Sequence, residues 1–323
     1  MLDHKRDNLK AWLILIIPMA LLIIFTLYPL VKTVMIAFNP QYNANTDSFG
    51  VNMKGIPIGF DSFIYLFSKG SFFPATIVNT LIIVFISVPA STIIALLIAV
   101  ALNSIKPLQK VFQTIFFLPY VTNVLAVGMV FNVLFQSPGQ SGLAQNGIIN
   151  AIFNLGNYNW LDLGASLWSW RSVVLIYSIW NGLAFKVLVF IGGLQNISKQ
   201  YYDAAKIDST PPRRVLTKIT IPLLMPMISY ILITSFIGAF KAYESVLGLF
   251  SNLQQFAITI FDQRNTMVGF TYRMIGYSYD KSRLVANTPQ YYSLGAAAAV
   301  ILLGIILIFT WVNMKISNRF SHH

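Results

Sequence analysis

Long apolar runs alternate with polar stretches along the chain, and the lengths of these runs define the predicted elements. A helix needs roughly 20 mainly apolar residues to cross about 30 Å of hydrocarbon with its backbone hydrogen bonds satisfied internally. The run that follows the charged start MLDHKRDNLK continues past the length of a signal-peptide core and lacks a small-residue cleavage site, so we interpret it as an uncleaved span. Six runs are predicted to span a membrane: 12–38, 76–103, 111–135, 171–195, 217–240 and 293–315.

Composition supports a membrane protein. Hydrophobic residues make up 56% of the 323 residues and charged residues only 10%, too few to cover the surface of a soluble globule. The formal charge of +12 is spread singly or in pairs, with no basic face that would favour a nucleic-acid partner. The absence of cysteine excludes a disulfide framework, a thiolate metal site and a cysteine nucleophile. The three histidines form neither a metal-site nor a triad pattern, so we expect no enzyme activity.

The distribution of lysine and arginine predicts the orientation. Basic residues near span ends in short loops favour the cytoplasmic side, which places both termini there. We therefore expect an all-α membrane protein with six transmembrane helices and cytoplasmic termini. The segments 39–75, 136–170 and 241–292 then lie outside, and their aromatic content is too high for disordered loops.

One polar stretch between two predicted spans is unusually compact: YYDAAKIDSTPPRRVLTKITIPLLMP at 201–226. Ser198 can cap a helix that begins at the next residue. Thr210 precedes Pro211, which ends that helix, and Thr210 can cap a second helix with Pro211 at its first position. Pro222 and Pro226 should bend the start of the fifth span. The pattern predicts a stiff helix–turn–helix elbow on the cytoplasmic side.

The elbow resembles the EAA loop of binding-protein-dependent ABC importer permeases. That loop reads Glu-Ala-Ala, two residues, Asp-Gly-Ala, then spaced Phe, Ile, Pro and Pro, and every spacing is preserved here. The matching positions are Asp203, Ala204, Ala205, Asp208, Leu216, Ile219, Pro222 and Pro226. The departures are Asp203 for Glu, Ser209 for Gly, Thr210 for Ala and Leu216 for Phe. A left-handed helix end is cheap for Gly and costly for Ser, so Ser209 puts the detailed geometry of the turn in question.

Other stretches are similar to the carbohydrate, maltose-transporter-like branch of this family, among them FFLPYV and WNGLAFKVLVFIGGLQNI. The stretch LGLFSN at 247–252 departs from it, because many members carry a Gly-rich turn ending in Pro there. The resemblance implies the type I ABC importer fold in a bacterial cell membrane, with a first helix and outer loop over 1–75, a permease core over 76–316 that includes the coupling loop 198–226, and a tail over 317–323.

The resemblance also implies partners: a second homologous permease subunit, two ATPase subunits that bind ATP and Mg²⁺, an extracellular solute-binding protein, and a carbohydrate substrate, which its branch indicates to be an oligosaccharide. This chain has no phosphate loop of its own, so no cofactor is expected in it. The residues implied to couple it to the ATPase are Asp203, Ala204, Ala205, Asp208, Ser209, Ile219 and Pro222.

Sugar sites pair aromatic rings with neutral hydrogen-bonding side chains, and five residues lie at suitable depth in the predicted spans. The pathway candidates are Asn123, Asn132, Trp180, Asn181 and Lys186. A charge in mid-span costs about 2.5–3.5 kcal/mol, so Lys186 needs a pathway role, an ion-pair partner or snorkelling to the surface. For Asn123 and Asn132 the alternative is hydrogen bonding between helices, and for Trp180 it is packing.

Three other functions stay open at this stage. One is an importer permease for a polyol or glycerol-phosphate-like solute, since Lys186 makes an anionic substrate conceivable. Another is an ion-coupled secondary transporter, although no carboxylate or histidine lies within the six spans. The last is a membrane sensor or scaffold that uses the elbow to dock another protein.

Overall fold

The described residues fold mostly into helices. The computed structural model describes residues 4–43, 47, 49, 58–105, 109–136, 147–161, 165–242, 248–249, 266–277 and 291–320, and every regular element among them is helical. The chain forms two compact units, residues 1–74 with 270–303 and residues 75–269 with 304–323. Four described helices have the length and apolarity of membrane spans, and two bent helix pairs bring the number to six if each pair is one span. The six predicted spans correspond to these elements.

The first unit begins with the predicted first span, a continuous helical rod of α1 (His4–Leu22), the π-helical turn η1 (Ile23–Leu27) and α2 (Tyr28–Ala37). Pro29 lies just after the wide turn. A proline in a helix lacks an amide hydrogen and crowds the carbonyl four residues earlier, which a π-turn relieves. The unit also holds α3 (Asp61–Leu66), most of α15 (Met267–Tyr277) and the first part of α16 (Tyr291–Phe320).

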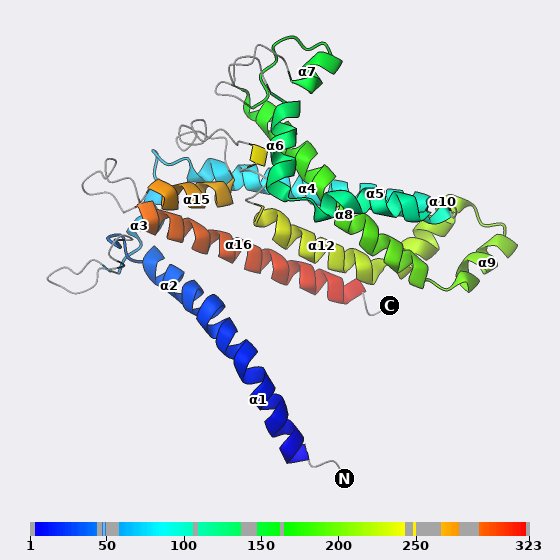
Figure 1. Ribbon diagram of the computed structural model, residues 1–323, viewed down its shortest axis with the longest axis horizontal. Coiled ribbons are helices and arrows are strands. Elements are labelled where there is room, and N and C mark those ends of the chain that lie inside the picture. The colour runs from blue at the N-terminus through cyan, green and yellow to red at the C-terminus, as the bar shows by residue number, and fades with distance from the viewer. Residues whose placement is uncertain are drawn as a thin grey trace. The chain divides into compact units, whose positions relative to one another are not determined.

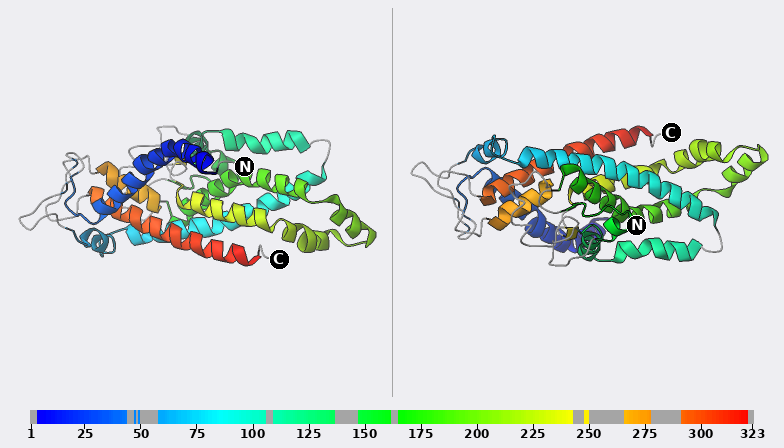
Figure 2. Two further views of the ribbon diagram at one scale, coloured as in Figure 1. Left: turned by 90° about the horizontal axis from the view of Figure 1, so that it is seen from below. Right: turned by 90° about the horizontal axis from the view of Figure 1, so that it is seen from above.

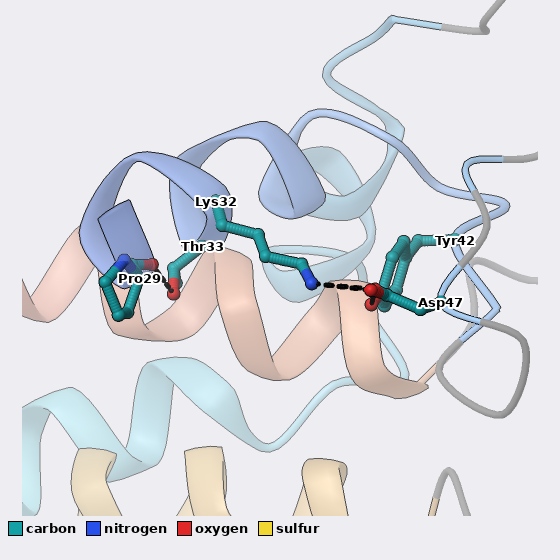
Figure 3. Close-up of polar contacts among 5 residues, drawn as sticks. All are labelled: Pro29, Lys32, Thr33, Tyr42 and Asp47. Atoms are coloured by element: carbon teal, nitrogen blue, oxygen red, sulfur yellow. Dashed lines mark hydrogen bonds and ion pairs between the residues drawn. The ribbon is translucent and has the colours of Figure 1, made fainter. Parts of the chain in front are cut away.

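An ion pair holds the segment after α2 against that helix, as Figure 3 shows. The Lys32 ammonium lies 2.8 Å from the Asp47 carboxylate, and the Tyr42 hydroxyl donates to the same carboxylate at 2.5 Å. The hydrogen bonds from Lys32 and Tyr42 hold the pKa of Asp47 below its ordinary value. Asp47 has a positive φ of 49°, which Asp tolerates better than most residues.

The second unit contains the other helices whose bounds the structure describes. They are α4 (Phe73–Ser104), α5 (Gln109–Val121), α6 (Val124–Leu134), α7 (Ile148–Ile152), α8 (Leu167–Asn196), α9 (Lys199–Ile207), α10 (Pro212–Val215), the π-turn η2 (Leu216–Thr220), α11 (Ile221–Leu223), α12 (Met225–Phe240) and the end of α16. Figures 1 and 2 show α8 between α5 and α12, both of which it contacts. The short helices α7 and α9 lie at opposite ends of α8 (Figure 1).

Two apolar clusters hold this unit together along α8. One joins α4, α8 and α12 through residues that include Ala95, Phe190 and Ile231, all with 0% exposure. The other joins α4, α6 and the first half of α8 around the buried Trp170 and Tyr177. Small residues such as Ala95 let spanning helices approach closely, and van der Waals packing rather than water exclusion then stabilises the contact.

The predicted third span is broken. Helices α5 and α6 meet at an angle of 100°, whereas the apolar run 111–135 predicted one span without a bend. Asn123 explains the break, because its backbone is extended and its side chain accepts hydrogen bonds from the amides of Leu125 at 2.8 Å and Ala126 at 3.4 Å. An asparagine cap of this kind begins a new helix rather than continuing the old one.

The predicted bend at the start of the fifth span is confirmed. The stretch Pro212–Leu223 and α12 meet at 68°. The break falls at Leu224, between Pro222 and Pro226, and these two prolines remove backbone donors on either side of it.

A glycine contact fixes a short segment of the chain against α6. A Cβ atom added to Gly128 would lie 2.7 Å from the Gly248 Cα atom, so only glycine fits on either side. The Asn132 amide donates to the Leu249 carbonyl at 2.5 Å, and Leu249 is fully buried. Gly248 and Leu249 belong to the stretch LGLFSN, and the rest of that stretch lies outside the described residues.

Candidate functional site

A cavity of about 440 Å³ opens between the helices of the second unit. Residues of α4, α8 and α12 form most of its wall, with contributions from Val124 and Thr266. Helical periodicity explains the wall, because lining positions in α4 and α8 recur every three or four residues and so share one face of each helix. The polar lining residues are Thr80, Ser87, Ser91, Tyr177, Ser178, Asn181, Lys186, Ser235, Lys241 and Thr266.

Lys186 is the most deeply buried charge on this wall, with 3% of its surface exposed. Its ammonium donates to the Ser91 hydroxyl of α4. Ser91 in turn donates to the Ser87 carbonyl at 2.5 Å, so its proton is engaged and its oxygen is free to accept. The contact between Lys186 and Ser91 therefore joins α8 to α4 across the cavity wall.

Two of the five pathway candidates, Asn181 and Lys186, line the cavity. The other three have different contacts. Asn132 bonds the distant Leu249 carbonyl, as its structural alternative expected, whereas Asn123 bonds the backbone of its own helix as the cap of α6. Trp180 is 39% exposed and its ring packs 5.4 Å from the ring of Phe131.

Sequence reasoning missed the hydroxyl groups of the cavity. Thr80, Ser87 and Ser91 lie on one face of α4, and a polar stripe at helical spacing was the available signal. Serine and threonine in a helix commonly bond their own backbone, as Thr80 does to the Thr76 carbonyl at 2.8 Å, so the stripe alone is ambiguous.

The elbow forms two short helices at the end of α8, as expected. Helix α9 has one buried residue, Ala205, with 6% exposure, while its neighbour Ala204 is exposed. Tyr201 and Ile207 of the same helix are exposed, at 53% and 85%. The sequence predicted that Ala204 and Ala205 both allow close approach of another protein, whereas Ala205 packs within this chain. The outward surface, called here the α9 face, consists of Tyr201, Ala204 and Ile207.

The turn after α9 closes in the left-handed conformation although it lacks glycine. Ser209 has a φ of 49°. The Ser209 amide donates to the Lys206 carbonyl at 3.0 Å and the Thr210 amide donates to the Ala205 carbonyl at 2.9 Å. These two bonds define a Schellman motif, the ending that glycine normally provides. Ser209 in place of the glycine of the EAA pattern therefore raises the free-energy cost of the turn, while the turn still closes in the left-handed conformation.

The helix caps of the elbow differ from the prediction. Ser198 stands at the start of α9 but its side chain makes no capping hydrogen bond. The second helix begins one residue later than expected, with Pro211 as its cap and Pro212 at the first position. Pro211 is extended, with ψ of 146°, because a residue that precedes a proline is excluded from the helical region.

The remaining candidate coupling residues are spread over the elbow. Asp203 pairs with Lys206 at 3.4 Å, an exposed contact that contributes little to stability, and Asp208 ends α9. Ile219 is half-buried in η2, and Pro222 is exposed in α11. Among the described residues, no group of His, Asp and Glu is placed to hold a metal ion.

The apolar spans, the cavity among them and the elbow define a multi-pass membrane transport protein. Residues 91–322 match the family described as binding-protein-dependent transport system inner membrane component, and the chain belongs to this family. It is an inner-membrane component and spans the membrane several times.

Curated relatives cover nearly the whole chain. A Mycoplasma genitalium protein named "Probable ABC transporter permease protein MG188" is 28% identical over 99% of this chain and 92% of its own length. The arabinooligosaccharides transport system permease protein of Bacillus subtilis is 25% identical over 93% of this chain and 85% of its own length.

A solved structure has the same fold. It is the crystal structure of a bacterial ABC transporter involved in the import of the acidic polysaccharide alginate, and the likeness has a TM-score of 0.72 at 20% identity. The match covers 98% of this chain and 97% of the other. The fold is therefore that of a type I ABC importer permease, as the sequence predicted.

Proposed function

We propose that this chain is the membrane-spanning permease subunit of an ATP-driven importer of carbohydrate, and that it forms half of the translocation pathway. Family membership and the arabinooligosaccharide permease among its relatives support this proposal. The cavity supports it as well, because its wall combines neutral hydroxyl and amide groups with the aromatic rings of Tyr177 and Phe185. Such a wall matches the hydroxyls and weakly apolar ring faces of a sugar.

The α9 face carries the coupling part of the proposal. On a helix beyond the end of the spans, Tyr201, Ala204 and Ile207 recur every three residues and share one side, which is open to a partner protein at Ile207, with 85% of its surface exposed. Ala204 beside it leaves room for close approach, and the Schellman motif holds the helix end in one conformation. A rigid, outward-facing helix of this kind suits the cleft of a cytoplasmic ATPase.

The proposed assembly contains this chain, a second homologous permease, two ATPase subunits that bind ATP and Mg²⁺, and an extracellular solute-binding protein. Both termini lie on the cytoplasmic side in this proposal. Residues 304–320 of α16 support that side for the C-terminus, since Figure 1 shows them antiparallel to α12 and ending toward α9. Phe309 packs 4.5 Å from Phe236, which fixes this pairing of helices.

Substitution of Ile207 by Asp tests the coupling role. We expect the variant to reach the membrane normally but to lose most of the ATPase that co-purifies with the transporter, together with ATP-driven uptake. A charged residue at Ala205 is a poorer test, because that side chain is buried within this chain.

The matched control is Ile152→Asp. Ile152 is also exposed, at 68%, but it lies on α7 at the other end of α8. Co-purification of the ATPase should survive this change. Equal ATPase recovery from both variants and the wild type would show that the α9 face is not the coupling surface.

The buried charge of Lys186 on the cavity wall supports the glycerol-phosphate-like alternative. Binding assays with the partner solute receptor separate it from a sugar importer. An ion-coupled secondary transporter predicts gradient-driven uptake by vesicles that contain this polypeptide alone, and we expect none.

A further inference from the structure

The charge on the wall of the cavity has one sign. Lys186 and Lys241 both line it, and among the described lining residues there is no Asp or Glu. Two cations on the wall of one mostly apolar cavity produce a positive potential that attracts anions. A cavity meant only for neutral sugars needs no such charge, and burying Lys186 is unfavourable in itself.

Lys186 has hydrogen-bonding capacity left for a solute. An ammonium group has three donors, and among the described residues its acceptor is the single hydroxyl of Ser91. Gly182 keeps the space beside the ammonium open, since a Cβ atom there would lie 3.4 Å from both the Lys186 Nζ and the Ser91 Oγ atoms. The ammonium is therefore held by Ser91 and keeps donors to spare on the wall of the cavity.

Lys241 supplies the second charge from a different wall. It is the C-terminal cap of α12, its side chain is exposed, and the preceding residues Gly238, Ala239 and Phe240 also line the cavity. The negative end of the α12 dipole stabilises a cation at this position. The two lysines thus reach the cavity from α8 and from the end of α12.

We infer that the cavity binds a sugar that carries an acidic group, with Lys186 and Lys241 as its anion-binding residues. Asn181, Ser178 and Ser235 line the same space and can bind the sugar hydroxyls. The acidic group is a carboxylate, as in a uronic acid, or a phosphate. Either anion accepts charge-assisted hydrogen bonds from an ammonium group. The inference rests on the proposed function and specifies its substrate class.

Binding of paired probes to the assembled transporter in lipid nanodiscs tests this inference. The solute-binding protein is left out, so that its own selectivity does not enter. The probes are galactobiose against digalacturonate, and glucose against glucose 6-phosphate. Each pair differs mainly in one kind of charged group, and the pair with the larger difference identifies the acid.

We expect the wild type to bind one acidic probe about tenfold or more tightly than its neutral counterpart, as suits a charge-assisted hydrogen bond. Lys186→Met should weaken the acidic probe by about tenfold to hundredfold and change the neutral probe by less than about twofold. Lys241→Gln should reduce the same preference with little effect on folding, because its side chain is exposed. Lys315→Gln, an exposed lysine of α16 outside the cavity, is the matched control and should keep the preference.

Equal binding of both members of each pair, no detectable binding of any probe, or a preference that survives both cavity variants would overturn the inference. The proposed function is tested separately by ATP-driven uptake with the binding protein present. Uptake that depends on ATP but favours neutral sugars would refute only the acidic substrate, whereas loss of all ATP-driven uptake would refute the importer itself.

Discussion

Ser209 stands where the turn after α9 requires a left-handed residue, and Ser209→Gly should stabilise that turn. A residue with a Cβ atom pays about 1–2 kcal/mol in this conformation. Glycine avoids that cost but loses more backbone entropy on folding, about 0.5–1 kcal/mol. With Ser209 at a φ of 49° and exposed, no other contact opposes the change. The net gain should be about 0.5–1 kcal/mol.

Hydrogen–deuterium exchange of the full-length chain in nanodiscs measures this gain. The amides of Asp208, Ser209 and Thr210 donate the bonds of the turn at 2.9–3.0 Å and exchange when it opens. A gain of about 0.5–1 kcal/mol slows their exchange about two- to fivefold, provided that local opening limits exchange. The β-branched variant Ser209→Val should accelerate it.

The control variant is Ser198→Gly, at the other end of α9. Ser198 has a negative φ and no side-chain capping bond, so glycine there gives no conformational advantage. Exchange in the turn should then be unchanged. The reasoning is refuted if Ser209→Gly exchanges at the wild-type rate or faster, since the turn would then not depend on a left-handed residue.

Two further changes test other contacts. Gly128→Ala should cost about 1–3 kcal/mol of unfolding free energy, because the new methyl group would lie 2.7 Å from the Gly248 backbone. The thermal unfolding midpoint should therefore fall. Gly304→Ala is the control and should not lower this midpoint, because no atom lies within 4 Å of the added methyl group. The carboxyl group of Asp47 has a lowered pKa, so its pairing with Lys32 stabilises the fold above the ordinary carboxyl pKa of about 4 and is lost as pH falls through the lowered value. Carbon-13 NMR titration should place the titration midpoint of the Asp47 carboxyl group below the ordinary value, and Lys32→Met should raise this midpoint. A midpoint that is unchanged by Lys32→Met would contradict the assignment.

The positions of the spans followed from the sequence, because a run of apolar residues must span lipid as a helix. The bend near Leu224 was also predictable, because Pro222 and Pro226 cannot continue a regular helix. The break between α5 and α6 did not, although Asn123 was visible as a polar residue in an apolar run. Its side chain had two possible partners, its own backbone or another helix, and only the fold decides between them.

The candidate site was predictable in part for the same reason. Lys186 stood out because a buried charge is costly, and it does line the cavity. The serine and threonine hydroxyls did not stand out, because a helix can satisfy them internally. The sequence also could not tell Ala204 from Ala205, since the direction each faces depends on how α9 packs beside its own spans.

Only Ile197 and Ser198 separate the end of α8 from the start of α9, and α8 is a single helix of 30 residues, about 45 Å long. Such a helix acts as a lever arm. If α8 pivoted by about 10° at its first residue, its far end would sweep about 8 Å, and Lys186, about 28 Å along it, would move about 5 Å. A modest displacement of α9 is therefore large enough to pull one wall of the cavity away from the Ser91 hydroxyl.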